Sequence, residues 1–131
     1  MRIEVTSSAL ERLRQEAEKA RPRECCGLLL GSGAHIGEAR PAANVAADPQ
    51  RHFEIDPQAL VDAHRAARAG GPEVIGYYHS HPEGPARPSD TDKAMASGDG
   101  RVWAIIGKGD VTFWRDGEEG FENLPYSLLE G

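Results

Sequence analysis

Two histidines that share one side of a predicted strand end are the most informative residues in this sequence. His79 and His81 flank Ser80 after an apolar stretch, and Pro82 follows directly. Because side chains alternate along a strand, both imidazoles leave the strand on the same face. Two neighbouring imidazoles supply half of a tetrahedral zinc site. The pair alone is more often two surface histidines, but with Pro82, Ser89 and Asp92 at their spacing it predicts a metal site at a strand end.

A polar segment further along the chain can complete this ligand set. Ser89 precedes Asp92 by three residues, which is the spacing of a helix N-cap and its capping box. That spacing alone would explain both residues without any function. An acid held in the first turn of a helix can also point at the strand end and offer a carboxylate oxygen. Three protein ligands with one open position are typical of a catalytic zinc site.

The elements that must position these residues alternate between strands and helices. Strands are predicted at residues 2–6, 25–30, 74–78, 102–106 and 111–114, with a weaker strand or hairpin at 34–47 and an edge element at 121–129. Helices are expected from a capping box at 8–11 through Ala20, from Asp56 and Pro57 to Gly70, and from Ser89 onward. This order is compatible with an α/β fold.

Composition narrows the class of protein. A chain of 131 residues with 39% hydrophobic side chains can bury one core, so residues 1–131 are expected to form a single domain. A net charge of −6 argues against a general nucleic-acid binder, which should show a basic stripe. The sequence has no run of 18 apolar residues and no apolar signal-peptide core at its start, so we expect no membrane span and a cytoplasmic protein.

The two cysteines are adjacent, as Cys25 and Cys26. Neighbouring Cα atoms lie about 3.8 Å apart, short of the usual disulfide range, so a bridge between the two is not expected. We expect free thiols, at least one of them in the core, and no catalytic role. The aromatic residues Trp103, Phe113 and Trp114 on the late strands are also expected in the core.

The candidate site residues resemble the motif of the JAMM metalloprotease family, also called MPN+ or JAB. That motif joins an upstream Glu to His-x-His-Pro, a Ser seven positions after the Pro, and x-x-Asp. Here these are Glu24, residues 79–82, Ser89 and Asp92, and the likeness extends over residues 3–113. The resemblance implies a curved mixed sheet flanked by helices, in the three-layer arrangement of cytidine deaminases, and a short chain similar to bacterial stand-alone members.

The resemblance also implies a role for each motif residue. His79, His81 and Asp92 would bind one zinc ion per chain. Glu24 would act as general base and then as general acid, and Ser89 would help to stabilise the tetrahedral oxyanion. These roles agree with what zinc, a carboxylate and a hydroxyl can do in amide hydrolysis.

The choice of Glu24 depends on the resemblance. Spacing alone does not favour Glu24 over Glu73 or Glu83. Glu24 is favoured because it directly precedes a predicted buried apolar strand, where a charged side chain is costly unless it has a function.

Three functions are weighed on this basis. The resemblance implies a zinc peptidase or isopeptidase that cleaves after the Gly-Gly tail of a ubiquitin-like or sulfur-carrier protein, with no nucleic-acid or membrane partner. One alternative is a non-catalytic MPN-type interaction module, against which the complete ligand set argues. Another is a radC-like DNA-repair-associated relative, but such proteins are longer and carry a helix-hairpin-helix region. A zinc deaminase would need His-x-Glu and Pro-Cys-x-x-Cys, which the sequence lacks.

Overall fold

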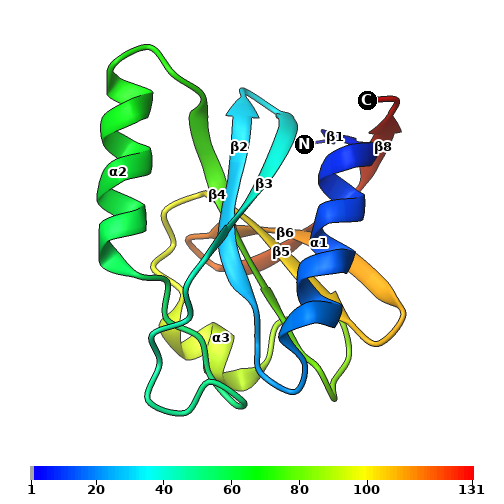
Figure 1. Ribbon diagram of the computed structural model, residues 1–131. Coiled ribbons are helices and arrows are strands. Elements are labelled where there is room, and N and C mark those ends of the chain that lie inside the picture. Colours follow the sequence, from blue (N-terminus) through cyan, green and yellow to red (C-terminus); the bar gives the residue numbers. More distant parts are fainter. Residues whose placement is uncertain (1) are drawn as a thin grey trace.

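The computed structural model describes residues 2–131 as one curved, eight-stranded sheet with three helices (Figure 1). The sheet order is β7-β6-β5-β4-β2-β3-β1-β8. The strands are β1 (Ile3–Thr6), β2 (Cys26–Ser32), β3 (His35–Ala42), β4 (Glu73–Ser80), β5 (Val102–Gly107), β6 (Asp110–Gly117), β7 (Gly120–Leu124) and β8 (Tyr126–Leu129). The helices are α1 (Ser7–Ala20), α2 (Pro57–Arg68) and α3 (Asp90–Met95).

The two longer helices cover opposite faces of the sheet. In β2, Leu29 packs into the larger core cluster with Leu13 of α1, whereas Leu28 and Leu30 pack with Ala63 of α2. This division follows from the alternation of side chains along a strand. Figure 1 shows α1 and α2 on either side of the central strands. The three layers confirm the predicted helix-flanked sheet.

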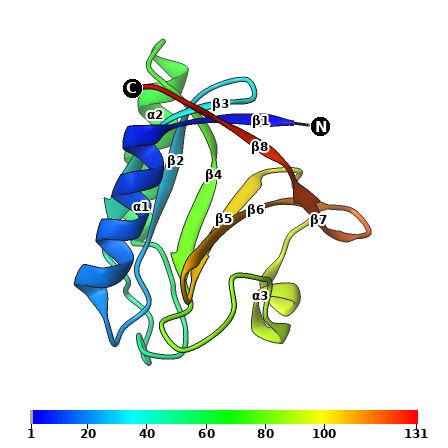
Figure 2. The same cartoon turned by 90° about the vertical axis from the view of Figure 1, so that its right-hand side faces the viewer.

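The sheet is mixed and strongly curled. The pairs β4–β5, β1–β3 and β1–β8 are parallel, and the remaining pairs are antiparallel. The register of β2 shifts near Leu30 against both of its neighbours, and such bulges bend a strand and increase its twist. In the side view of Figure 2, β1 and β8 cross the top of the sheet while β4 descends to the opposite end. The lower end of β4 is where the histidines lie.

The helix starts agree with the sequence in two cases and differ in one. Asp56 caps α2 by accepting the Gln58 N–H at 3.1 Å, and Ser89 caps α3, as predicted. The cap of α1 is Thr6, whose hydroxyl accepts the Ala9 N–H at 3.2 Å. The expected capping box at Ser8 is therefore wrong. β1 leads directly into the helix, so the cap lies two residues earlier.

The last part of the chain also differs from the expectation. A single edge element was predicted for 121–129, but β7 and β8 lie at opposite edges of the sheet. Pro125 separates them, and a proline has no N–H to donate to a ladder. Its carbonyl accepts the Ile3 N–H at 3.2 Å, which starts the pairing of β8 with β1.

Between residues 2 and 131, none of the helices has the length and apolar character needed to cross a bilayer.

Candidate metal centre and active site

The two histidines leave β4 on one face of the sheet, as predicted. His79 lies within the strand, and the His81 N–H extends the ladder by donating to the Ile106 carbonyl at 2.8 Å. Ser80, between them, points to the other face, where its hydroxyl accepts the Cys25 N–H at 2.8 Å. The strand end is therefore anchored on both sides, and both imidazoles are held toward the same space.

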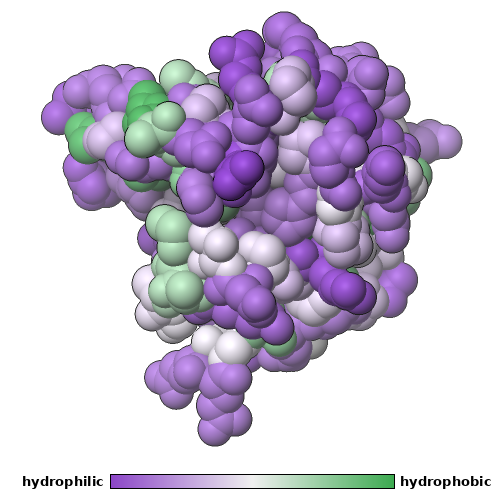
Figure 3. Space-filling view, turned by 90° about the horizontal axis from the view of Figure 1, so that it is seen from below, coloured by the Kyte–Doolittle hydropathy of each residue, from purple (hydrophilic) through white to green (hydrophobic). Residues whose placement is uncertain are grey.

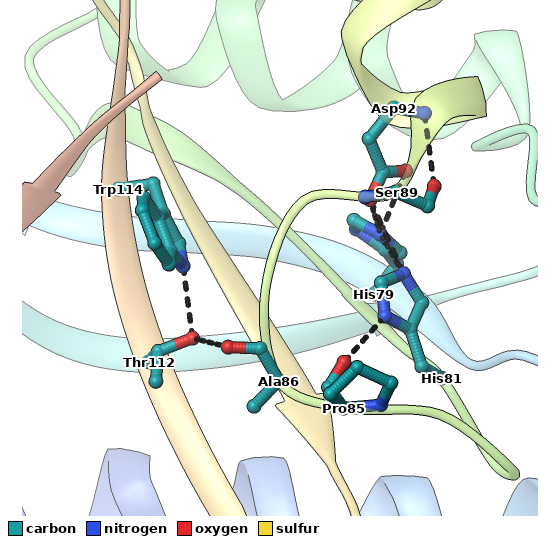
Figure 4. Close-up of polar contacts among 8 residues, drawn as sticks. All are labelled: His79, His81, Pro85, Ala86, Ser89, Asp92, Thr112 and Trp114. Carbon is teal, nitrogen blue, oxygen red and sulfur yellow. Dashed lines mark hydrogen bonds and ion pairs between the residues drawn. The ribbon is translucent and has the colours of Figure 1, made fainter.

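The start of α3 brings the carboxylate to the histidines. The Ser89 hydroxyl accepts the Asp92 N–H at 3.0 Å, and the Ser89 N–H donates to Asp92 Oδ2 at 3.0 Å. This reciprocal capping box fixes the side chain of Asp92 in the first turn. Asp92 is 4% exposed, and its carboxylate faces the histidines in Figure 4.

Two imidazole nitrogens and one carboxylate converge in this space. His79 Nε2 lies 3.1 Å from His81 Nε2 and 3.0 Å from Asp92 Oδ1, and His81 Nε2 lies 3.2 Å from Asp92 Oδ2. Ligand atoms 2.0–2.1 Å from a tetrahedral zinc ion are separated by roughly 3.3 Å. The donor set and its spacing therefore fit a zinc ion.

One ring nitrogen of His81 has a partner outside this cluster. His81 Nδ1 lies 2.9 Å from the Pro85 carbonyl oxygen, which can only accept (Figure 4). The proton therefore lies on Nδ1 in the neutral ring, and the lone pair of Nε2 points at the other two side chains. A fixed tautomer of this kind is typical of metal-binding histidines.

The pKa shifts favour ligand forms for His79 and Asp92. Burial lowers the pKa of His79 and keeps its ring neutral. Burial alone would raise the pKa of Asp92, but its contacts with His79 and His81 outweigh that effect and hold the pKa below its usual range. For His81, burial acts to lower the pKa, while hydrogen bonds to Asp92 and the Pro85 carbonyl raise it further than burial lowers it. A carboxylate beside two imidazoles attracts positive charge, whether a proton or a metal ion.

Aromatic rings form the wall behind His79. The ring of Phe53 stacks on the imidazole with centroids 4.2 Å apart, and Trp103 meets it edge-on at 5.6 Å. Trp103 is buried as expected, but it packs against the site rather than in the core under α1. Phe53 lies in the loop between β3 and α2 and escaped sequence reasoning because a loop aromatic shows no periodicity.

Glu24 lies beside this cluster because of strand register. In the β2–β4 ladder Cys26 pairs with His79, and the Ser80 N–H donates to the Cys25 carbonyl at 3.1 Å. The same antiparallel register places Glu24 opposite His81, on the face that carries the imidazoles. Register, which the sequence does not show, thus brings the fourth polar residue to the site.

The surroundings of Glu24 hold its backbone and perturb its carboxyl group. The Glu24 N–H donates to the Pro49 carbonyl at 2.8 Å, and Asn44 Nδ2 donates to the Glu24 carbonyl at 3.0 Å. The residue is 8% exposed. Burial is the main cause that raises its pKa to about 7; Asp92 raises it further and His81 opposes the shift. Such a carboxyl group exchanges protons near neutral pH.

The other two acids considered for this position lie elsewhere. Glu73 is at the opposite end of β4, where its carboxylate accepts the Gly33 N–H at 2.8 Å. Glu83 has a side chain that is 75% exposed and pairs with Arg21 at 3.4 Å. Of the three, Glu24 alone is both buried and adjacent to the cluster.

A groove of about 680 Å³ gives access to these residues. Its lining includes Glu24, His81, Ser89 and Asp92, together with residues 50–53, 82–85, 87 and 88. The face of the molecule on which β4 ends is predominantly hydrophilic (Figure 3). All five motif residues therefore lie at one end of the sheet, four of them lining the groove directly.

Known proteins share both the sequence and the fold. Residues 6–117 match the family of prokaryotic homologs of the JAB domain. Desampylase of Haloferax volcanii is 39% identical over 100 residues, which cover 75% of this chain and 72% of that protein. A probable TtuB-protein conjugate cleaving protease of Thermus thermophilus is 35% identical over 88 residues, and the match spans 67% of this chain and 59% of that protein.

Solved structures agree with this assignment. A solution structure of a protein from Desulfitobacterium hafniense has a TM-score of 0.85 and 30% identity, covering 98% of this chain and 94% of that chain. The crystal structure of a JAB1/MPN domain protein from Archaeoglobus fulgidus shares the fold, with a TM-score of 0.66 and 20% identity over 98% of this chain and all of that one. Sequence, fold and motif positions agree: the chain belongs to the prokaryotic JAB (JAMM/MPN) family of hydrolases.

Proposed function

We propose that this protein is a zinc-dependent isopeptidase that cleaves after the Gly-Gly tail of a ubiquitin-like or sulfur-carrier protein. The observation that carries the proposal is the convergence of His79, His81 and Asp92 within 3.2 Å, next to the buried Glu24. Two relatives support a protein conjugate as the substrate, because one is named a desampylase and the other a probable TtuB-protein conjugate cleaving protease.

His79, His81 and Asp92 would hold the zinc ion. Their nitrogen and oxygen donors match the ligand preferences of zinc, and three protein ligands leave a position open for chemistry. When bound there, zinc supplies a Lewis acid that activates water near neutral pH and polarises the scissile carbonyl.

Glu24 would carry the proton. Its carboxylate takes the proton of the attacking water and returns it to the leaving amine. Both transfers are most efficient when the pKa of the carboxyl group is close to the working pH. Burial raises the pKa of Glu24 in the metal-free protein, which strengthens its carboxylate as a proton acceptor.

Ser89 would meet the negative charge that develops on the carbonyl oxygen. In the capping box its hydroxyl oxygen accepts the Asp92 N–H, so the hydroxyl proton is available for a further bond. The backbone N–H of Ser89 is already bound to Asp92 Oδ2. The side chain, rather than the backbone, is therefore the donor that Ser89 contributes to the oxyanion.

The depth of the site supports a tail of two glycines. His79 is 1% exposed and Asp92 4%, so the scissile bond must pass between the residues that line the groove. Glycine has no Cβ and brings its backbone closer to a wall than any other residue. A Gly-Gly end reaches the recessed carboxylate and imidazoles where a bulkier tail would be stopped at the rim.

The proposal is tested with a purified ubiquitin-like carrier joined through its Gly-Gly tail to a reporter peptide. We expect mass spectrometry to show a single cut after the second glycine, lost with a chelator and restored by zinc. Replacement of either tail glycine by valine should slow cleavage sharply. Equally fast cleavage of casein-like chains would show that the protein is a general metallopeptidase and has no preference for the carrier. A carrier that binds but stays intact would indicate an interaction module instead.

A further inference from the structure

The loop between the second histidine and Ser89, residues 82–88, rests on the hairpin that joins β5 to β6. The Lys108 N–H in the hairpin turn donates to the Gly84 carbonyl at 3.1 Å. The loop also crosses Gly107 so closely that a Cβ there would lie 2.6 Å from the Pro85 carbonyl carbon. Only glycine permits this approach without moving the backbone. The hairpin therefore supports the loop through one hydrogen bond and close backbone packing.

A side chain of the same hairpin ties the loop more specifically. Thr112 Oγ1 donates to the Ala86 carbonyl at 2.6 Å, and Trp114 Nε1 donates to Thr112 Oγ1 at 2.8 Å (Figure 4). Because the hydroxyl oxygen accepts from the indole, its proton is directed to the loop. Hydrogen bonds in such a chain strengthen one another.

Strand register explains why Thr112 can reach the site loop. His79 pairs with Ile105 in β5, and Ile105 pairs with Thr112 in β6. Residues paired across a ladder share a face, so Thr112 lies on the same face as His79, two strands away. The loop leaves β4 on this side and passes over β5 to meet the hydroxyl.

The bonds lead from Thr112 to His81 in three steps. Thr112 holds the Ala86 carbonyl, the planar peptide bond joins Ala86 to Pro85, and the Pro85 carbonyl lies 2.9 Å from His81 Nδ1. The Pro85 carbonyl is the partner that fixes the ring orientation of His81. A shift of the loop would remove that partner while leaving β4 itself in place.

We propose that Thr112 is a positioning residue that holds the loop 82–88 and, through the Pro85 carbonyl, orients His81 for metal binding. This inference rests on the proposed zinc site. Loss of an outer hydrogen bond that orients a metal ligand commonly weakens metal affinity by about 10- to 100-fold. Thr112 acts through two intervening residues, so we expect an effect near the lower value.

The test compares Thr112→Val with Thr112→Ser in the full-length zinc-loaded protein. Valine keeps the shape and suits a strand but has no hydroxyl, whereas serine keeps the hydroxyl. Competition with a chromophoric chelator should show zinc affinity about 10-fold weaker in the valine variant. The serine variant should remain within about two-fold of the wild type, because it retains the donor. Amide exchange at Lys108 should accelerate only in the valine variant, since that N–H binds the Gly84 carbonyl.

Thr6→Val is the matched control for a loss of stability alone. Thr6 also uses its hydroxyl structurally, as the cap of α1, and it lies in β1, outside the residues that line the groove. This variant should unfold at a lower temperature with unchanged zinc affinity. Wild-type zinc affinity in folded Thr112→Val, or the same loss in Thr6→Val, would overturn the positioning role.

Two further variants, Trp114→Phe and His81→Ala, separate a failure of the positioning role from a failure of the proposed zinc site. If Thr112→Val does not fold, Trp114→Phe decides, because it removes the indole donor and leaves the threonine in place. It should weaken zinc binding by about three-fold, less than an outer bond to a ligand itself, and unchanged affinity would reject the inference. A wild-type protein that binds no zinc, or a His81→Ala variant that still binds it fully, would instead refute the proposed zinc site.

Discussion

Glu24 lies across from His81, two positions beyond the Cys26–His79 pair of the antiparallel β2–β4 ladder. The candidate base is therefore placed by the pairing of two strands rather than by a mobile loop. A slip of one residue in this register would turn Glu24 to the opposite face, away from the cluster. The bond from the Cys25 N–H to the Ser80 hydroxyl, at 2.8 Å, opposes such a slip.

The position of Glu24 predicts the behaviour of Glu24→Gln, which keeps the shape and removes the base. Hydrolysis of the carrier conjugate should fall by at least ~100-fold, the lower range for general acid–base catalysis, while zinc stays bound. Single-turnover kinetics and elemental analysis measure the two quantities. Glu73→Gln, at the far end of β4, is the control and should retain the wild-type rate. Wild-type turnover in Glu24→Gln would move the proton transfer to another group.

The same substitution should stabilise the metal-stripped protein, in a pH-dependent manner. The pKa of Glu24 is about 7 in the folded protein and 4.5 as a free group, so the folded state binds more protons between these values. Its stability therefore falls as the pH rises from about 4.5 through 7. Glutamine has no such dependence, so at pH 8 the variant should be more stable by up to roughly 3 kcal/mol.

Urea unfolding of metal-stripped protein checks this expectation. The difference in unfolding free energy between Glu24→Gln and wild type should be small at pH 5 and should grow toward pH 8. A difference of the same size at both pH values would show that burial does not perturb the Glu24 carboxyl group. A protein often becomes more stable when a buried charged side chain that serves chemistry, and not packing, is replaced by a neutral one.

Features that depend on residues close together in the sequence could be predicted, whereas features that depend on long-range strand pairing could not. The capping box of Ser89 and Asp92 and the shared face of His79 and His81 depend on spacings of two or three residues, and the structure contains both. The placement of Glu24 opposite His81 depends on strand register across 57 positions of chain, which no local pattern encodes. The cap at Thr6 was missed because β1 and α1 join without a loop. The separation of β7 from β8 depends on an edge partner, β1, at the other end of the chain.

The cysteines should be unreactive in the folded protein. Burial is the main cause that raises the pKa of Cys25 to about 11 and that of Cys26 to about 12. From the usual value of 9.0, a rise of two units lowers the thiolate fraction at pH 8 by about 100-fold. Iodoacetamide should therefore modify both thiols slowly in buffer and rapidly in urea, as followed by mass spectrometry. Rapid labelling of the folded chain would contradict this burial.

Asp116 predicts a stability effect that sequence reasoning did not find. It is 1% exposed, and its carboxylate accepts the N–H groups of Ser97 and Gly98 at 3.1 Å each. These bonds hold the segment that joins α3 to β5. Asp116→Asn keeps only one acceptor oxygen and turns an NH2 donor toward one of these part-buried N–H groups, so it should lower the unfolding free energy by about 1–3 kcal/mol. Denaturant unfolding measures this, with exposed Glu119→Gln as the control; an unchanged midpoint would contradict it.

The aromatic residues behind His79 allow metal binding to be followed by the intrinsic tryptophan fluorescence of the protein. The chain has two tryptophans. Trp103 lies 5.6 Å from the His79 ring, and Trp114 is bonded to the threonine that holds the loop. The emission of Trp103 therefore originates beside the candidate metal centre, and that of Trp114 originates beside the threonine that holds the loop. Cobalt in place of zinc would quench this light at short range, so metal exchange and tail docking can be followed by stopped-flow fluorescence without a label.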